Sequence, residues 1–222
     1  MKTNRKAFDM IRAAAAALVI ISISVSATVW FRPVYYFDIG YLQIPQKSGY
    51  TAEECRQNYD ALIDYNVIFG EKELKFPDMD MSEQGRIHFK EVKDIFIPMQ
   101  IMAAAGIAVF VLWLAASLRR GIKEKNVRWM RYTVILVITV CVCVAAAMLA
   151  DWQGTFAFMH SVLFDNDYWL FNPDTDPVIK ILPDTFFFHC GGMIVILTAV
   201  ETAALEYFYR RIRNGKGRER DH

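Results

Sequence analysis

The sequence has few cysteines, and their spacing excludes the common disulfide frameworks and zinc motifs. There are four cysteines among 222 residues, with no Cys-x-x-Cys pair. Cys141 and Cys143 lie two positions apart, so on a helix they point in different directions and do not pair easily. Cys55 and Cys190 are candidates for a bridge in an oxidising compartment, but two free buried thiols are the simpler expectation. Redox chemistry therefore has no support in this sequence.

The chain also lacks a large excess of charge, internal repeats and low-complexity tracts. Its 25 Lys and Arg residues face 24 Asp and Glu residues, which leaves a formal net charge of +1. Domains that bind nucleic acid usually carry a strongly basic face, and we expect no nucleic-acid partner. What the sequence has in abundance is hydrophobic residues, which make up 55% of the chain.

Four long apolar runs indicate an integral membrane protein. Each is close to or above the roughly 20 residues that cross about 30 Å of hydrocarbon. Because these runs occupy much of the chain, we expect one mainly α-helical membrane domain over residues 1–222. The predicted transmembrane helices are residues 13–31, 97–118, 132–150 and 186–209.

Charge is distributed unevenly between the segments that connect these runs. Lys and Arg gather in residues 1–12, 119–131 and 210–222, whereas residues 32–96 and 151–185 are acidic on balance. Four spans would leave the three basic segments on one side of the membrane. The positive-inside rule then predicts that both termini are cytoplasmic and that two outer loops form an extracytoplasmic cap.

The first run has some features of a secretory signal peptide. A basic start precedes the apolar residues, and Val25-Ser26-Ala27 is a possible cleavage site. The run nevertheless continues through Phe31 and reaches spanning length. Cleavage would also leave an odd number of spans and reverse the charge pattern, so we expect a retained anchor.

The larger outer loop contains signals for a helix and for a short strand. Thr51 and Glu54 have the spacing of a capping box, with Thr51 as the N-cap. They precede apolar residues at helical spacing, which predicts an amphipathic helix over residues 52–69. Residues 32–44 mix aromatic and β-branched side chains, and this composition predicts a short strand.

A further helix is expected from Ser82 toward the membrane. His88, Val92 and Ile95 would share one face of it, at helical spacing. This face would lie on the bilayer surface, with His88 about two turns from the next span. Pro98 is expected at the start of that span, where its missing N–H costs little.

Residues 158–188 are rich in aromatic side chains but are interrupted by turn formers such as Asn172-Pro173. The segment is too apolar for a solvated linker, and its Asp and Pro residues exclude a membrane-spanning helix. Aromatic rings beside Asp and Asn are typical of the boundary between water and lipid. His160 lies in this segment and can titrate near neutral pH.

Three histidines, His88, His160 and His189, fall at the predicted outer boundary and allow three chemistries to be compared. A zinc site would combine His88 and Glu91 with His160 or His189, but no HExxH-type pattern supports it. Ser161 follows His160 directly, which is a poor spacing for a nucleophile and its base on a helix. General acid–base catalysis needs only two imidazoles placed around the substrate.

Two motifs resemble the bacterial lipoprotein intramolecular transacylase (Lit) family of four-span membrane proteins. The first is Ile87-His88-Phe89-Lys90-Glu91-Val92-Lys93, and the second runs from His160 through Phe164, Trp169-Leu170-Phe171-Asn172-Pro173 and Asp176 to Pro183, Phe186 and Phe187. A weaker match covers residues 50–65. The resemblance extends over nearly the whole chain but departs from the family pattern at Glu91, where an Asp is expected.

The resemblance implies an acyltransferase that acts on a diacylated lipoprotein within the bacterial cytoplasmic membrane. Its substrate would carry an S-diacylglyceryl group and a free α-amine on the N-terminal cysteine. The enzyme would move the sn-2 acyl chain onto that amine and so produce an N-acyl, S-monoacylglyceryl (lyso-form) lipoprotein. The catalytic pair implied is His88 and His160 at the outer leaflet, with no cofactor and no metal.

Further residues are candidates for binding the substrate, and His189 is expected to be structural. Four aromatic side chains would form rigid walls, and three more residues would orient an imidazole or a substrate carbonyl. These seven residues are Trp169, Tyr168, Phe164 and Phe171, followed by Arg86, Glu91 and Tyr65. The alternative from a different class is a non-enzymatic accessory or regulatory protein that binds a partner through its outer loops.

Overall fold

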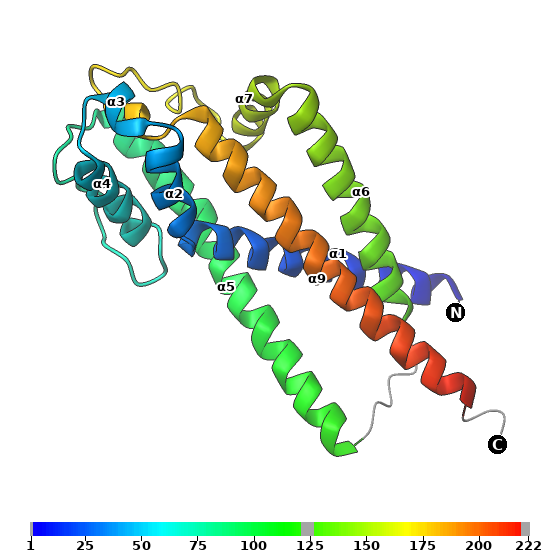
Figure 1. Ribbon diagram of the computed structural model, residues 1–222. Coiled ribbons are helices and arrows are strands. Elements are labelled where there is room, and N and C mark those ends of the chain that lie inside the picture. The colour runs from blue at the N-terminus through cyan, green and yellow to red at the C-terminus, as the bar shows by residue number, and fades with distance from the viewer. Residues whose placement is uncertain (1, 121–126, 219–222) are drawn as a thin grey trace.

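The computed structural model describes residues 2–120 and 127–218, and this part of the chain is almost entirely helical (Figure 1). The mainly α-helical fold class is thereby confirmed. The helices are α1 (Lys2–Trp30), α2 (Pro33–Tyr41), α3 (Ile44–Ser48), α4 (Ala52–Tyr65), α5 (Glu83–Arg120), α6 (Arg128–Ala150), α7 (Trp152–Leu163), α8 (Val178–Ile181) and α9 (Asp184–Arg218).

Four of these helices are long and apolar enough to cross a membrane. They overlap the four predicted spans over most of their length, and their extents are Arg5–Trp30, Glu83–Ala116, Arg128–Ala150 and Asp184–Arg213. Helix α1 packs against each of the other three, α5, α6 and α9. Its C-terminal half carries small polar side chains that are buried in the bundle, namely Ser22, Ser24, Ser26 and Thr28. Small side chains at such positions let neighbouring helices approach closely.

The expected strand over residues 32–44 is wrong, because the described chain forms α2 and then α3 there. Pro33 occupies the first turn of α2, where its fixed φ favours a helix and its missing N–H costs nothing. Tyr35, Asp38 and Ile39 are the buried residues of α2. Their i, i+3, i+4 spacing is that of one helix face, so packing against α4 and α9 overrides the local preference of the aromatic residues for a strand.

Helix α5 joins the expected outer helix and the second span into one continuous element. Pro98 therefore lies inside a helix of 38 residues, and the expectation that it stands at a helix start, where its missing N–H costs little, is wrong. A proline there removes one hydrogen bond to the preceding turn, but the helix continues on both sides. As a result, α5 carries His88 near its N-terminal end and the residues of the predicted span toward its C-terminal end.

The remaining short helices, with their connecting segments and the outer turns of α5, form a cap at one end of the bundle (Figure 1). The predicted capping box is present, since the Thr51 hydroxyl accepts from Glu54 N and the Glu54 carboxylate accepts from Thr51 N. Helix α4 ends at Tyr65, four residues earlier than expected, where Asn66 donates to the Leu62 carbonyl at 2.8 Å. Tyr35 and Tyr59 stack at a centroid distance of 3.9 Å in the core of the cap.

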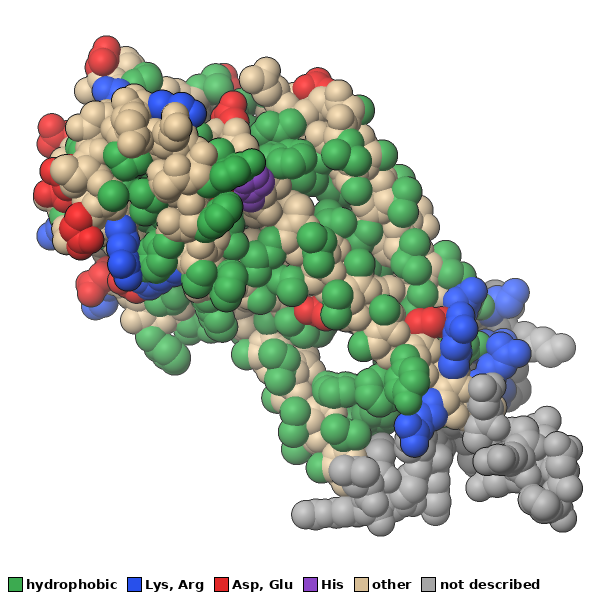
Figure 2. Space-filling view, in the orientation of Figure 1, with side chains coloured by type: hydrophobic (Ala, Val, Ile, Leu, Met, Phe, Trp, Pro, Cys, Tyr) green, Lys and Arg blue, Asp and Glu red, His purple; other side chains and the backbone are tan. Residues whose placement is uncertain are grey.

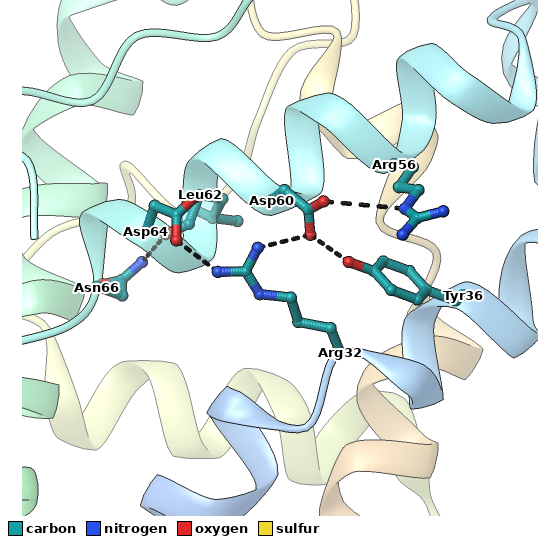
Figure 3. A network of polar contacts seen from close by, with 7 residues as sticks. All are labelled: Arg32, Tyr36, Arg56, Asp60, Leu62, Asp64 and Asn66. Atoms are coloured by element: carbon teal, nitrogen blue, oxygen red, sulfur yellow. Dashed lines mark hydrogen bonds and ion pairs between the residues drawn. The ribbon is translucent and has the colours of Figure 1, made fainter.

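Charged side chains hold α4 against the junction of α1 and α2 (Figure 3). The Arg32 guanidinium pairs with Asp60 at 2.9 Å and also with Asp64. The Tyr36 hydroxyl donates to the same Asp60 carboxylate at 2.7 Å. Because Arg32 directly follows the first span, this network orients the cap relative to the bundle.

Both chain termini lie at the end of the bundle opposite the cap (Figure 1). Lys and Arg side chains gather at that end in Figure 2, whereas Asp and Glu side chains are frequent on the cap. Among the described side chains at this end, the Glu206 carboxylate of α9 pairs with Arg210 of the same helix at 2.7 Å and with Arg131 of α6 at 3.2 Å. The second ion pair joins α6 to α9.

Candidate active site

The two histidines of the sequence motifs face each other at the junction of cap and bundle. His88 lies on the second turn of α5, and His160 lies on the last turn of α7. Their ring centroids are 6.0 Å apart at an interplanar angle of 32°. Both side chains are buried, with exposed fractions of 5% and 8%. Residues separated by 72 positions in sequence thus bring two imidazoles to one small volume.

The loop after α7 is tied to the start of α5, close to the helix turn that carries His88. The Asp176 carboxylate accepts from Ser82 N at 2.8 Å, and Ser82 in turn accepts from Gly85 N. A Cβ at Gly85 would lie 2.3 Å from Asp176 Oδ1. Glycine is therefore required at this position if the loop is to approach the helix so closely.

Aromatic rings enclose both imidazoles. Phe164 and Phe171 contact the His88 ring edge-on, at centroid distances of 4.8 and 5.4 Å. Trp169 stacks on the His160 ring at 4.6 Å. The structure therefore brings three of the four predicted wall residues to the histidine pair. Tyr168 is half-buried beside them, and its backbone N–H donates to Asn166 Oδ1 at 3.0 Å.

Phe156 is a residue of the site that the sequence analysis missed. Its ring lies 4.1 Å from that of His160, and its backbone carbonyl accepts a hydrogen bond from His160 Nδ1 at 2.8 Å. The sequence contained one indication of this contact. Phe156 lies four positions before His160, a spacing that places both residues on one face if the segment is helical.

The bond to Phe156 determines which His160 nitrogen can accept a proton. A carbonyl oxygen only accepts, so His160 Nδ1 carries the hydrogen and Nε2 of the neutral ring keeps its lone pair. Burial lowers the pKa of His160, and the bond to the Phe156 carbonyl opposes this effect without cancelling it. At neutral pH the ring is consequently an uncharged base with Nε2 available.

The Nδ1 atom of His88, unlike that of His160, makes no hydrogen bond to the described residues. This atom is also buried. A buried polar atom without a partner costs free energy and calls for an explanation. A group that arrives with the substrate would remove this cost.

Glu91 lies one turn beyond His88 on the same face of α5. Its Oε1 accepts from Asn166 Nδ2 at 2.8 Å, whereas its Oε2 is buried without a partner. The longer Glu side chain therefore still reaches the loop after α7.

Two other predicted residues lie elsewhere. Arg86 is half-exposed and pairs with Glu83 at 3.3 Å. Tyr65 is buried in the core of the cap, with the Lys93 ammonium 4.1 Å above its ring.

His189 forms a separate polar pair. Its Nδ1 lies 3.0 and 2.9 Å from the two carboxylate oxygens of Asp38. The Asp38 side chain is fully buried. Because this pair joins α2 to α9, it holds the cap to the fourth span.

The alternative chemistries have little support in the described residues. Ser161 donates to the Phe158 carbonyl at 2.8 Å and is exposed. In this part of the chain, no group of three or more His, Cys, Asp and Glu side chains has the arrangement of a metal site. Cys55 and Cys190 are free thiols, as expected from the sequence.

Comparisons with known proteins agree with the resemblance of the motifs. A family model described as lipoprotein intramolecular transacylase Lit matches residues 10–187. The chain is also similar to the in meso structure of the membrane-integral lipoprotein intramolecular transacylase Lit from Bacillus cereus. That match has 30% identity and a TM-score of 0.86, and it covers 97% of this chain and 99% of the other.

Two further Bacillus cereus Lit structures, in which one histidine is replaced, match over most of their length. The arginine variant has 30% identity and a TM-score of 0.79, covering 96% of this chain and 94% of the other. The alanine variant has 31% identity and a TM-score of 0.78, covering 95% and 94%. The search of curated proteins found no match. These similarities favour an enzyme over an accessory protein.

Proposed function

The chain belongs to the lipoprotein intramolecular transacylase (Lit) family and is an acyltransferase, and from this premise we propose a specific reaction. The substrate is a lipoprotein whose N-terminal cysteine carries an S-diacylglyceryl group and a free α-amine. The enzyme transfers the sn-2 acyl chain to that amine and leaves a lyso-form lipoprotein. His88 and His160 are the acid–base pair.

The observation that carries this proposal is the facing pair of imidazoles, with ring centroids 6.0 Å apart. One group must remove a proton from the amine, and another must protonate the departing glyceryl oxygen. A pair of rings at this separation allows one to lie on each side of the reacting ester. Each proton transfer of this kind contributes roughly 10²–10⁴-fold to the rate.

We assign the base role to His160, because its Nδ1–H is engaged by the Phe156 carbonyl and Nε2 is the accepting atom. The α-amine of a peptide is largely protonated at neutral pH. In our proposal the ammonium first loses one proton to water, because two imidazolium rings 6.0 Å apart among buried aromatic side chains would repel each other. His160 accepts the second proton as the nitrogen attacks the ester carbonyl. This proton then passes through His88 to the glyceryl oxygen as the bond between that oxygen and the acyl carbon breaks. The reactants are an ammonium group and an ester, and the products are an amide, an alcohol and one proton released to water, so the reaction balances.

The aromatic walls provide the second requirement, which is a fixed substrate geometry. The attacking amine and the ester belong to one flexible molecule, and the attack closes a medium-sized ring. Holding such reactants in a near-attack geometry removes an entropic barrier. Phe164, Trp169 and Phe171 are rigid side chains around the two histidines and restrict the folded lipid to a few conformations.

We propose that the cap lies outside the membrane and that both termini are cytoplasmic. The basic side chains at the end of the bundle that bears the termini support this orientation (Figure 2). The diacylglyceryl group of a lipoprotein anchored in the outer leaflet then reaches the histidine pair without leaving the bilayer.

A labelled substrate tests the reaction directly. Purified enzyme is incubated with a diacylglyceryl-cysteinyl peptide whose sn-2 chain alone is isotopically labelled, and the N-terminal peptide is fragmented by mass spectrometry. We expect an unchanged total mass with the labelled chain on the amine. An N-acetylated peptide serves as the control and should not react. An unlabelled chain on the amine would contradict the sn-2 assignment, and no transfer at all would contradict the substrate.

A further inference from the structure

Glu91 is a half-buried carboxylate that differs in one respect from two buried carboxylates of the cap, Asp38 and Asp176. Both oxygens of Asp38 face His189 Nδ1. The two oxygens of Asp176 accept from Ser82 N and from the Thr175 hydroxyl, each at 2.8 Å. Glu91 uses only Oε1, and its Oε2 is buried without a donor among the described residues.

The cations nearest to Glu91 along α5 are engaged elsewhere. Lys90 pairs with Asp94 at 2.7 Å, and the Lys93 ammonium donates to the Glu71 carbonyl. Arg86 pairs with Glu83. A buried carboxylate is costly unless a cation or a hydrogen-bond donor compensates its charge. The Lys90 charge acts on Glu91 from nearby, but none of these three described cations forms an ion pair with it.

Glu91 is also held in a defined orientation at the edge of the histidine site. It lies three residues after His88, so the two side chains share one face of α5. Asn166 Nδ2 donates to Glu91 Oε1, and Asn166 Oδ1 accepts from Tyr168 N. The amide of Asn166 is therefore fixed in both directions, which holds Oε1 and leaves Oε2 as the free oxygen.

We infer that Glu91 Oε2 is the receptor for the α-ammonium group of the substrate. This inference rests on the proposed function, which requires a substrate with a free N-terminal amine. A carboxylate that binds the ammonium places the nitrogen about one helical turn from His88, on the same face of α5. The contact would also make the enzyme selective for substrates with a free N-terminal amine, because a substrate without this positive charge leaves Glu91 Oε2 unpaired. Glu91 is thus a substrate-binding residue with a defined ligand group.

The test uses two unreactive ligands that differ only at this group. Both are dialkylglyceryl (ether-linked) cysteinyl peptides, and in the second the α-amine is replaced by hydrogen. Their dissociation constants are measured by displacement of a fluorescent lipopeptide from the wild-type protein and from Glu91→Gln. Asp94→Asn is the matched control, because Asp94 is an exposed acid on the same helix that pairs with Lys90.

We expect the wild-type protein and Asp94→Asn to bind the amine ligand roughly 10- to 100-fold more tightly than the des-amino ligand, as for a charge-assisted hydrogen bond. Glu91→Gln should lose most of this preference by weakening only the amine ligand. The KM of the reactive substrate should rise by a similar factor. Glu91→Asp keeps the charge and should retain part of the preference, which provides a second variant if Glu91→Gln folds poorly.

Two outcomes would overturn the inference. Equal binding of both ligands by the wild-type protein would exclude an ammonium receptor without any variant. An equal loss for both ligands in Glu91→Gln would assign the residue to the support of His88 instead. A failure of the proposed function is recognised separately, since the labelled-substrate assay then gives no acyl transfer by the wild-type protein whatever the two dissociation constants are.

Discussion

Two histidine sites lie at the end of the bundle that carries the cap, and they differ in whether their polar atoms already have partners. At the first, His189 Nδ1 faces both oxygens of the fully buried Asp38. At the second, His88 Nδ1 has no partner and His160 uses only Nδ1. At the first site the buried carboxylate already has its partner, whereas at the second a buried imidazole nitrogen, His88 Nδ1, remains to be paired.

This difference gives a criterion for distinguishing a structural histidine from one that binds or reacts with a substrate, namely whether its buried polar atoms already have partners. Both sites lie at the end of the bundle that carries the cap, and both contain an imidazole next to buried side chains. A satisfied pair stabilises the fold, because removing either partner leaves the other unpaired. An unsatisfied group raises the free energy of the empty site and is explained most simply by a ligand. The following predictions test this contrast, from the largest expected effect to the smallest.

The largest effect is expected from removing the imidazoles of the proposed acid–base pair. His88→Ala and His160→Ala should each lower kcat/KM by roughly 10²–10⁴-fold, or about 3–5 kcal/mol of transition-state stabilisation. The double variant should lose little more than either single one, because the two residues act as a unit. Formation of the lyso-form is followed by mass spectrometry, with protein amount measured in the same membranes. Near-normal activity of either variant would remove that residue from the acid–base pair.

His189→Ala should act on stability instead. It leaves the buried Asp38 carboxylate without its partner, a change that costs about 3–5 kcal/mol in fully buried pairs. We expect about 3 kcal/mol here, since 32% of the His189 side chain is exposed. Thermal unfolding in detergent measures this loss, and activity per folded molecule should stay within a few-fold of wild type. The double variant with Asp38→Asn and His189→Gln carries no buried charge and should recover part of the stability. A loss of turnover without a loss of stability would contradict the structural role.

The smallest effect concerns pH. Burial disfavours the charged form of His160 and lowers its pKa. The ordinary pKa of histidine is about 6.5, so we expect His160 to stay neutral when the pH falls somewhat below 6.5. The acid limb of the kcat/KM profile should therefore lie below pH 6.5. Trp169→Ala opens one face of the ring and should move this limb to higher pH by less than about one unit. Leu170→Ala, at an exposed neighbour, is the control and should leave the limb in place.

The sequence was most informative where a single local rule applied. Four apolar runs predicted the four spans, because length and hydropathy alone decide whether a segment can cross a bilayer. Thr51 and Glu54 predicted a capping box that involves only neighbouring residues. The family motifs singled out His88 and His160 together with Phe164, Trp169 and Phe171 around them, and these are the residues that the fold brings into contact.

Local rules failed where packing between distant segments competed with them. Residues 32–44 have the composition of a strand, but Tyr35 is drawn into the core of the cap and its hydroxyl donates to the Ile181 carbonyl at 2.9 Å. Pro98 suggested a helix start, although the helix continues through it as part of α5. Nothing in the sequence distinguished Asp38 from the other acidic residues of the outer loop as the partner of His189.

By itself, then, the sequence determined the membrane-spanning architecture and the set of residues available for chemistry, because hydropathy, capping and motif spacing act over short distances along the chain. Only the tertiary structure decided which of three similar histidines already has a carboxylate partner and which two face each other. Hydrogen bonding depends on the positions of atoms from α2, α5, α7 and α9, and those positions follow from how the helices pack.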